Sequence, residues 1–303
     1  MHKLPYVNDG TNAEPRLALY LNLDTLLGLR PASVWPGYTG LERDRQLEED
    51  GFEGVQLTTP ASTPVDTSLA YCGLGRVNVR QDATVLAAAH ADRGDLCLTL
   101  HVGWGMEDDD EAFRLVEAVL NSSTKHGIPM FIETHRSTIT QDLWRTVQIA
   151  RRFPEVRFNG DFSHYYCGQE LVYGDWSRKL DFMQPIFDRI GFIHGRIASP
   201  GCIQMPIDED LHSHPSASTG AVNYVAHFRE LWTRAMTGFL SQAGPGDLLV
   251  FAPELLRSKI SYARQFRFGD GVVTEETDRY EQALRHKQLA IECFAEAKLH
   301  ARK

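Results

Sequence analysis

The 303 residues suffice for one large hydrophobic core, and the composition, 43% hydrophobic and 23% charged, is ordinary for a globular protein in water. The net charge of −9 excludes a general nucleic-acid binder, because affinity for phosphate backbones comes from clustered Lys and Arg, and no apolar run approaches the ~20 residues that cross a membrane. The five cysteines are an odd number without a CxxC pair, which disfavours a disulfide framework and favours a cytoplasmic protein.

The N-terminal half alternates apolar strands with helical segments. Residues 1–15 are polar and are predicted to form a loose tail, whereas residues 16–303 are predicted to form one domain. Strands are predicted at 16–23, 52–57, 76–79 and 96–101. Helices are predicted at about 41–50 and 81–92.

The C-terminal half continues this alternation. The acidic residues 108–111 suit the positive end of a helix dipole and predict a helix there. Thr140 is predicted to cap the next helix, and further helices are predicted at about 176–189, 222–242 and 274–299. The segment 198–220, rich in Pro, Ser and Gly, is predicted to be a long loop. Between the helices lie four apolar runs, which end in Glu133, Asp161, His194 and Glu254.

This order of elements predicts an α/β protein whose parallel strands are joined by helices. Eight strand–helix units in a chain of this length match a single-domain (β/α)8 TIM barrel. A doubly wound open sheet is the alternative. The absence of a Gly-x-Gly-x-x-Gly motif after the first strand speaks against it.

The polar residues that end the last four strands are the candidate site. In a barrel, the carboxyl ends of all strands meet at one face, where active sites lie. Three carboxylates packed closely there would repel one another, and a divalent cation would remove that repulsion. Glu133, Asp161, His194 and Glu254 would together suit Mn²⁺, Mg²⁺, Co²⁺ or Zn²⁺. The alternative is that four unrelated polar residues end these strands.

These residues resemble the xylose isomerase-like TIM barrels, the sugar phosphate isomerase/epimerase superfamily, over about residues 95–262. The resemblance rests on four short motifs, which contain Glu133 to Arg136 with Thr140 and Asp142, Asp161 to His164, His194 and Arg196 with Gln204, and Pro253 with Glu254. It implies that Glu133, Asp161, His194 and Glu254 hold one divalent metal ion, with Mn²⁺ favoured.

The resemblance also implies a reaction and its catalytic pair. Glu133 and Glu254 would transfer protons at a carbon beside a carbonyl, while the metal stabilises the enediolate that forms. The expected activity is therefore that of an isomerase or epimerase of a small sugar or related polyol.

Five further residues are candidates for substrate contacts. His164 lies three residues after Asp161, where the superfamily places a contact to a substrate hydroxyl, and Arg196 lies two residues after His194. His101 and His135 end strands, and each is equally explained as a structural histidine. Gln204 is a polar residue of the predicted loop.

Three other functions fit parts of the same pattern. A lyase could use the site for β-elimination from a keto-sugar or keto-glycoside. The abasic-site endonucleases share this barrel, but their pattern is that of a three-zinc site, which uses more histidines than this sequence offers. A barrel that only binds a ligand or partner is the remaining alternative, and a homo-oligomer is possible for any of these.

Overall fold

The computed structural model describes residues 6–58, 68–208, 223–269 and 271–301. Within these residues, eight parallel strands close into a barrel, because β11 pairs with both β2 and β8. The barrel strands in chain order are β2 (Arg16–Asn22), β3 (Gly54–Leu57), β4 (Ala70–Val77), β5 (Leu98–Val102), β6 (Met130–Glu133), β7 (Phe158–Asn159), β8 (Ile190–Gly195) and β11 (Asp247–Pro253). The predicted (β/α)8 TIM barrel is confirmed.

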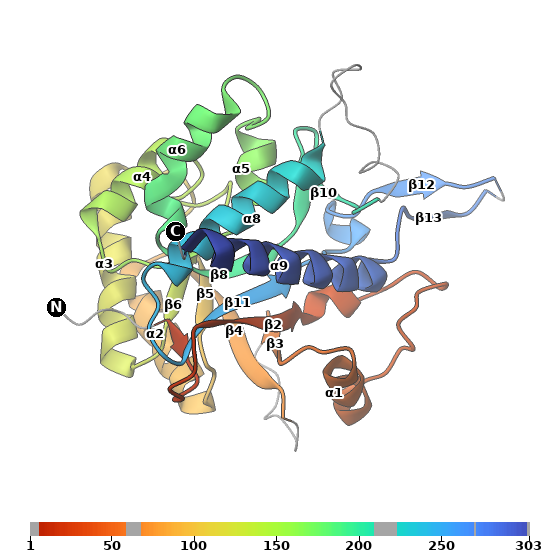
Figure 1. The fold of residues 1–303 in the computed structure, drawn as a ribbon, viewed down its shortest axis with the longest axis horizontal. Helices are drawn as coiled ribbons and strands as arrows, with labels where there is room; N and C mark the ends of the chain where they lie inside the picture. Colours follow the sequence, from red (N-terminus) through yellow and green to blue (C-terminus); the bar gives the residue numbers. More distant parts are fainter. Residues whose placement is uncertain (1–5, 59–67, 209–222, 270, 302–303) are drawn as a thin grey trace.

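Helices cover the outside of the barrel (Figure 1). In the described residues they are α1 (Gly40–Glu49), α2 (Arg80–Arg93), α3 (Asp109–His126), α4 (Leu143–Arg152), α5 (Phe162–Gly168), α6 (Trp176–Phe187), α8 (Tyr224–Leu240) and α9 (Arg279–Ala301). Helices α8 and α9 lie side by side across the barrel strands (Figure 1). No helix in the described part of the chain is long and apolar enough to cross a membrane.

Large side chains fill the barrel interior below the candidate site. Tyr20, Phe131 and Phe192 are buried there in one apolar cluster. Glycines make room for these rings, since a Cβ on Gly191 would lie 2.4 Å from the Phe131 ring. Side chains alternate between the two faces of a strand, so the residues two positions further along also point inward. These positions are occupied by Asn22, Glu133 and His194.

Two N-terminal segments differ from their prediction. Part of the predicted loose tail is attached to the barrel, because β1 (Val7–Asn8) pairs antiparallel with β11 and the ring of Tyr6 lies 4.8 Å from that of Phe239. The third barrel strand, β4, begins earlier than the predicted 76–79, because its first residues pair with β3. Val79 lies outside the strand and precedes α2.

Segments in the C-terminal half also differ. The predicted loop 198–220 begins with a two-stranded antiparallel sheet of β9 (Ile197–Ser199) and β10 (Cys202–Met205). Residues 209–220 of that loop, and residue 222 at the start of the helix predicted at 222–242, lie outside the described residues. The helix predicted at 274–299 begins only at α9, because residues up to Glu275 form a hairpin of β12 (Gln265–Arg267) and β13 (Val273–Glu275). Figure 1 shows this hairpin projecting from the barrel.

Thr140 does not cap a helix. Asp142 caps α4, where its carboxylate accepts a hydrogen bond from the backbone N–H of Arg145 at 2.8 Å. The Thr140 hydroxyl instead donates to the backbone carbonyl of Glu133 at 2.6 Å and accepts from the N–H of His135 at 3.1 Å. Thr140 therefore closes the loop that follows the first predicted metal ligand.

Candidate metal centre

The four predicted metal ligands meet at the carboxyl end of the barrel. Glu133 ends β6, His194 lies near the end of β8, Glu254 follows β11, and Asp161 caps α5 after β7. One ligand atom from each lies within 4.8 Å of those from the others. All four residues are buried, with Glu254 the most exposed at 6%. The structure thus brings together the complete set that the sequence predicted.

Arg196 lies inside this cluster. Its guanidinium pairs with the carboxylate of Asp161 and lies 3.2 Å from Oε2 of Glu254. Burial opposes the charge of Arg196, but these two carboxylates raise its pKa above the ordinary value. Three ionised carboxylates and one guanidinium leave two negative charges. The donor set therefore fits one divalent cation in both charge and chemistry.

The protonation of the acids reflects their crowding. Burial raises the pKa of Asp161, with a further contribution from the charge of Glu133, although Arg196 lowers it in part. Burial likewise raises the pKa of Glu254, although His194 and Arg196 act against it. Buried carboxylates have lost the water that would stabilise their negative charge, so binding of a cation among them is favourable.

Glu133 and His194 behave as a charged pair in this cluster. Burial would raise the pKa of Glu133, but the imidazoles of His101 and His194 hold it well below its usual range. Burial would lower the pKa of His194, but the carboxylates of Glu254 and Glu133 raise it to about 9. His194 therefore carries a proton near neutrality unless a metal ion takes that proton's place.

A chain of buried amides fixes the ring of His194. Nε2 of His194 lies 2.8 Å from Oε1 of Gln56, and this oxygen also accepts from the amide of Asn22 at 2.9 Å. The amide nitrogen of Gln56 donates to the Thr99 hydroxyl at 2.8 Å, so the atom of Gln56 that faces His194 is the side-chain oxygen, which accepts. Nε2 therefore donates, and Nδ1 faces the cluster. A histidine that binds a metal ion usually has its second ring nitrogen held in this way.

Asn159 connects His194 to Glu133. Its side-chain oxygen accepts the backbone N–H of His194 at 3.0 Å, so its amide nitrogen points to Oε2 of Glu133 at 3.1 Å. Sequence reasoning missed Asn159, Gln56 and Asn22. Each is a polar residue near the carboxyl end of a strand, at a position where the alternation of side chains along the strand directs it into the barrel. That combination is the sequence signal that would have identified them.

Three histidine rings lie beside the cluster. Nε2 of His101 is 3.2 Å from Oε1 of Glu133, and the rings of His101 and His135 have centroids 4.4 Å apart. The rings of His135 and His164 follow at 3.9 Å. His101, Glu133 and His135 form a second group that could hold a metal ion.

His164 is the most enclosed of these rings. Its Nε2 lies 3.3 Å from the Arg196 guanidinium, and its buried Nδ1 has no hydrogen-bond partner among the described residues. Burial lowers its pKa well below the ordinary value, and nearby His135 and Arg196 contribute. His164, Arg196, His101 and His135 thus border the predicted ligands, and their contacts to a substrate stay a prediction.

The side-chain amide of Gln204 binds the backbone of Leu256, two residues after Glu254. Its amide nitrogen donates to the backbone carbonyl of Leu256 at 3.1 Å, and its oxygen accepts the N–H of Leu256 at 2.8 Å. A direct substrate contact by Gln204 stays a prediction, and the contacts observed for its amide are those to the backbone of Leu256.

Tyr262 is a neighbour of the cluster that sequence reasoning missed. It follows a short 3-10 helix (Ser258–Ile260), and its ring lies 4.8 Å from the Arg196 guanidinium. Burial raises the pKa of its hydroxyl. The local sequence of Tyr262 carries no strand-end signal, and only the folded chain brings it to the site.

Solved structures share this fold, although no family model matches the sequence and no curated protein is similar to it. A xylose isomerase-like TIM barrel protein from Mycobacterium smegmatis, in complex with magnesium, is 13% identical, with a TM-score of 0.51 over 97% of this chain and 99% of that chain. The probable 3-DHS dehydratase AsbF from Bacillus anthracis, involved in petrobactin synthesis, is 14% identical, with a TM-score of 0.51 over 78% and 92%. Protein SMc04130 from Sinorhizobium meliloti 1021 is 12% identical, with a TM-score of 0.50 over 92% and 98%. The fold is that of the xylose isomerase-like TIM barrels.

Proposed function

We propose that the protein is a divalent-metal-dependent isomerase or epimerase of a small sugar or related polyol. The observation that carries the proposal is the convergence of Glu133, Asp161, His194 and Glu254, whose ligand atoms lie within 4.8 Å at the carboxyl end of the barrel. A bound divalent cation, with Mn²⁺ favoured and Mg²⁺, Co²⁺ or Zn²⁺ as alternatives, would polarise a substrate carbonyl and stabilise the charge of an enediolate.

Glu133 and Glu254 are the proposed proton-transfer pair. They extend from β6 and β11, which are separated in the barrel by β7 and β8, and each has a carboxylate oxygen within 3.5 Å of Nδ1 of His194. One carboxylate would remove the proton beside the carbonyl, and the other would return it. Return to the opposite face of the same carbon gives an epimer, and return to the neighbouring carbon gives an isomer.

The residues around the pair would hold the substrate and exclude water. His164 and Arg196 are almost completely buried beside the acids, and Tyr262 lies over Arg196. The side chain of His101 is 22% exposed and reaches toward solvent. The expected contacts are hydrogen bonds from these side chains to substrate hydroxyl groups.

The test combines metal analysis with solvent exchange. Purified protein, soaked with Mn²⁺ and desalted, should hold one divalent ion per chain, and an E133A/D161A double variant should lose it. A panel of ketoses and aldoses in D₂O should then show deuterium uptake that E254Q abolishes, as followed by NMR. Retained exchange in E254Q would contradict the role of Glu254. Absence of metal in the soaked protein would favour a barrel that only binds a ligand or partner.

A lyase is the second candidate, because the same proton abstraction can expel a β-oxygen. His101 supports it, because Nε2 of His101 lies 3.2 Å from Oε1 of Glu133. Burial would lower the pKa of His101, but the charge of Glu133 raises it, so the imidazolium of His101 could protonate the leaving oxygen. The two reactions give different products. Elimination loses water or an alcohol from the substrate, whereas isomerisation and epimerisation conserve its composition.

A further inference from the structure

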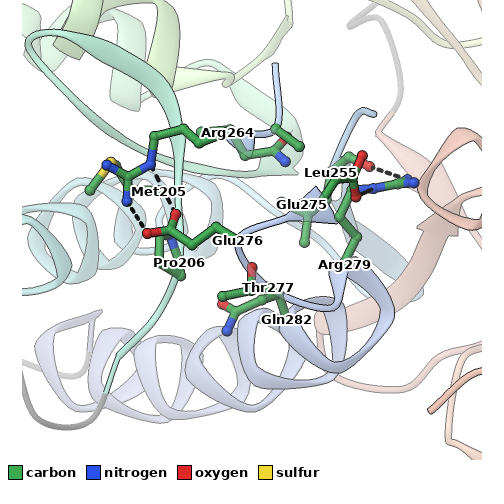
Figure 2. Close-up of a pocket in the computed structure, with 11 residues that line it drawn as sticks. Met205, Pro206, Leu255, Arg264, Glu275, Glu276, Thr277, Arg279 and Gln282 are labelled. Carbon is green, nitrogen blue, oxygen red and sulfur yellow. Dashed lines mark hydrogen bonds and ion pairs between the residues drawn. The ribbon is translucent and has the colours of Figure 1, made fainter. Parts of the chain in front are cut away.

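The backbone that carries Glu254 leaves the barrel sheet directly after β11, and other parts of the chain hold it in place. The N–H of Leu255 donates to the Thr25 hydroxyl at 3.1 Å. The carbonyl of Leu255 accepts from the guanidinium of Arg279 at 3.3 Å, and Arg279 is itself paired with Glu275. Figure 2 shows Leu255, Arg279 and Glu275 together at the edge of one pocket. The first residue after Glu254 is therefore fixed by the 3-10 helix that follows β2 (Leu23–Leu26) and by α9.

The second residue after Glu254 is held by Gln204 and by the N–H of Ala263, which donates to the carbonyl of Leu256 at 3.2 Å. Both backbone groups of Leu256 are bound by the amide of Gln204, at 2.8 Å for the N–H and 3.1 Å for the carbonyl. Gln204 belongs to β10 and is 8% exposed. Its amide replaces the strand partner that Leu256 has lost, because a backbone group out of water needs a partner. Gln204 thus connects the loop that contains Glu254 to β10.

We propose that Gln204 is a positioning residue for Glu254. The inference rests on the proposed function, since it takes Glu254 as a metal ligand. A ligand on a loop holds its geometry only as well as the groups that support the loop, and loss of a supporting contact typically weakens metal binding. Gln204 does not touch the cluster, so its effect on metal binding is transmitted through the backbone from Leu256 to Glu254.

The chain contains a matched control. Gln282 of α9 forms the same bridge with Ile207, accepting its N–H at 2.7 Å and donating to its carbonyl at 3.2 Å. Gln282 is 6% exposed and labelled in Figure 2. Ile207 carries no predicted ligand. Gln204→Met and Gln282→Met therefore remove the same two side-chain hydrogen bonds, and only the first acts on the loop of Glu254, where the carbonyl of Leu256 keeps the N–H of Ala263 as a donor.

The experiment measures Mn²⁺ affinity of the full chain after metal removal, by electron paramagnetic resonance of the free ion. Gln204→Met should bind Mn²⁺ about 10- to 100-fold more weakly than the unsubstituted protein, with an altered spectrum of the bound ion. Gln282→Met should bind as the unsubstituted protein does. Thermal unfolding of the metal-free variants should show similar losses, because both lose one bridge. Equal Mn²⁺ affinity of the two variants would overturn the proposal.

Two further outcomes are distinguishable. If the unsubstituted protein takes up no Mn²⁺, the proposed function fails and this inference fails with it, whereas equal affinities in the two Met variants overturn the inference alone. If Gln204→Met does not fold, Gln204→Glu provides the test, because it keeps an acceptor for the N–H of Leu256 and loses the donor. Its Mn²⁺ affinity should fall below that of Gln282→Met, and an unchanged affinity would overturn the proposal.

Discussion

Arg196 is a buried charged residue on which the stability of the metal-free protein is expected to depend. Its guanidinium is 1% exposed and pairs with Asp161 and Glu254, which are also buried. Removing one partner of a buried ion pair leaves the other charge without compensation. The Arg196 guanidinium is therefore expected to stabilise the metal-free protein strongly, whatever it contributes to a reaction.

Arg196→Met should lower the free energy of unfolding of the metal-free protein by roughly 3–5 kcal/mol. Arg264→Met is the control, because Arg264 pairs with Glu276 near the surface, where such a pair contributes about 1 kcal/mol or less. Urea denaturation in the presence of EDTA measures both. Added Mn²⁺ should restore part of the loss in Arg196→Met, since a cation replaces the guanidinium. Equal losses in the two variants would contradict this account.

The strands explain which site residues the sequence could predict. Glu133 and His194 lie on β6 and β8, where an apolar run ends in a polar residue, so strand prediction alone places them at one face. Their convergence with Asp161 and Glu254 is as predicted, and metal binding by the four stays a prediction. Gln56 and Asn159 lie one and two residues before the ends of the runs predicted as strands, so a prediction that considers only the last residue of each run does not include them.

Other features of the elements depend on contacts between distant segments. The bridge between Gln204 and Leu256 joins residues 52 positions apart, and Tyr262 meets Arg196 from a loop. No local pattern encodes such contacts. The hairpin of β12 and β13 was missed for a different reason, because its strands are three residues long and mostly exposed and so lack the apolar pattern of a buried strand.

The close approach of β8 to β6 gives a prediction for the barrel interior. A Cβ on Gly191 would lie 2.4 Å from the Phe131 ring, and Phe131 lies two residues before Glu133. Gly191→Ala should therefore lower the free energy of unfolding by about 1–3 kcal/mol, because overpacking forces side chains from their preferred rotamers. Gly201→Ala is the control, since no atom of the described part of the chain lies within 4 Å of its added Cβ. Thermal unfolding measures the stability of both variants. An unchanged stability of Gly191→Ala would contradict the prediction and would show that the Phe131 ring can move to make room for the added methyl group.

At the scale of the whole molecule, closure of the barrel places a charged cluster in its interior, and this makes global stability depend on pH. In the unfolded chain a histidine titrates near ~6.5. In the folded, metal-free protein the pKa of His194 is about 9. The stabilisation from its proton is complete below about pH 6.5 and is lost as the pH rises through about 9. The lowered pKa of Glu133 affects stability only in acid, where that carboxylate becomes protonated.

The metal-free protein should therefore lose stability between pH 6.5 and 9.5, by an amount on the order of 3 kcal/mol, since one pKa unit corresponds to ~1.4 kcal/mol. Saturating Mg²⁺ should abolish this loss, because the cation takes the place of the proton among the carboxylates. Urea denaturation at several pH values, with EDTA or with Mg²⁺, measures the difference. The variant His194→Asn should show a smaller loss with EDTA, because His101, whose pKa is also raised by Glu133, then remains as the source of the pH dependence. A decline of equal size with and without Mg²⁺ would mean that the cation does not enter the cluster around His194.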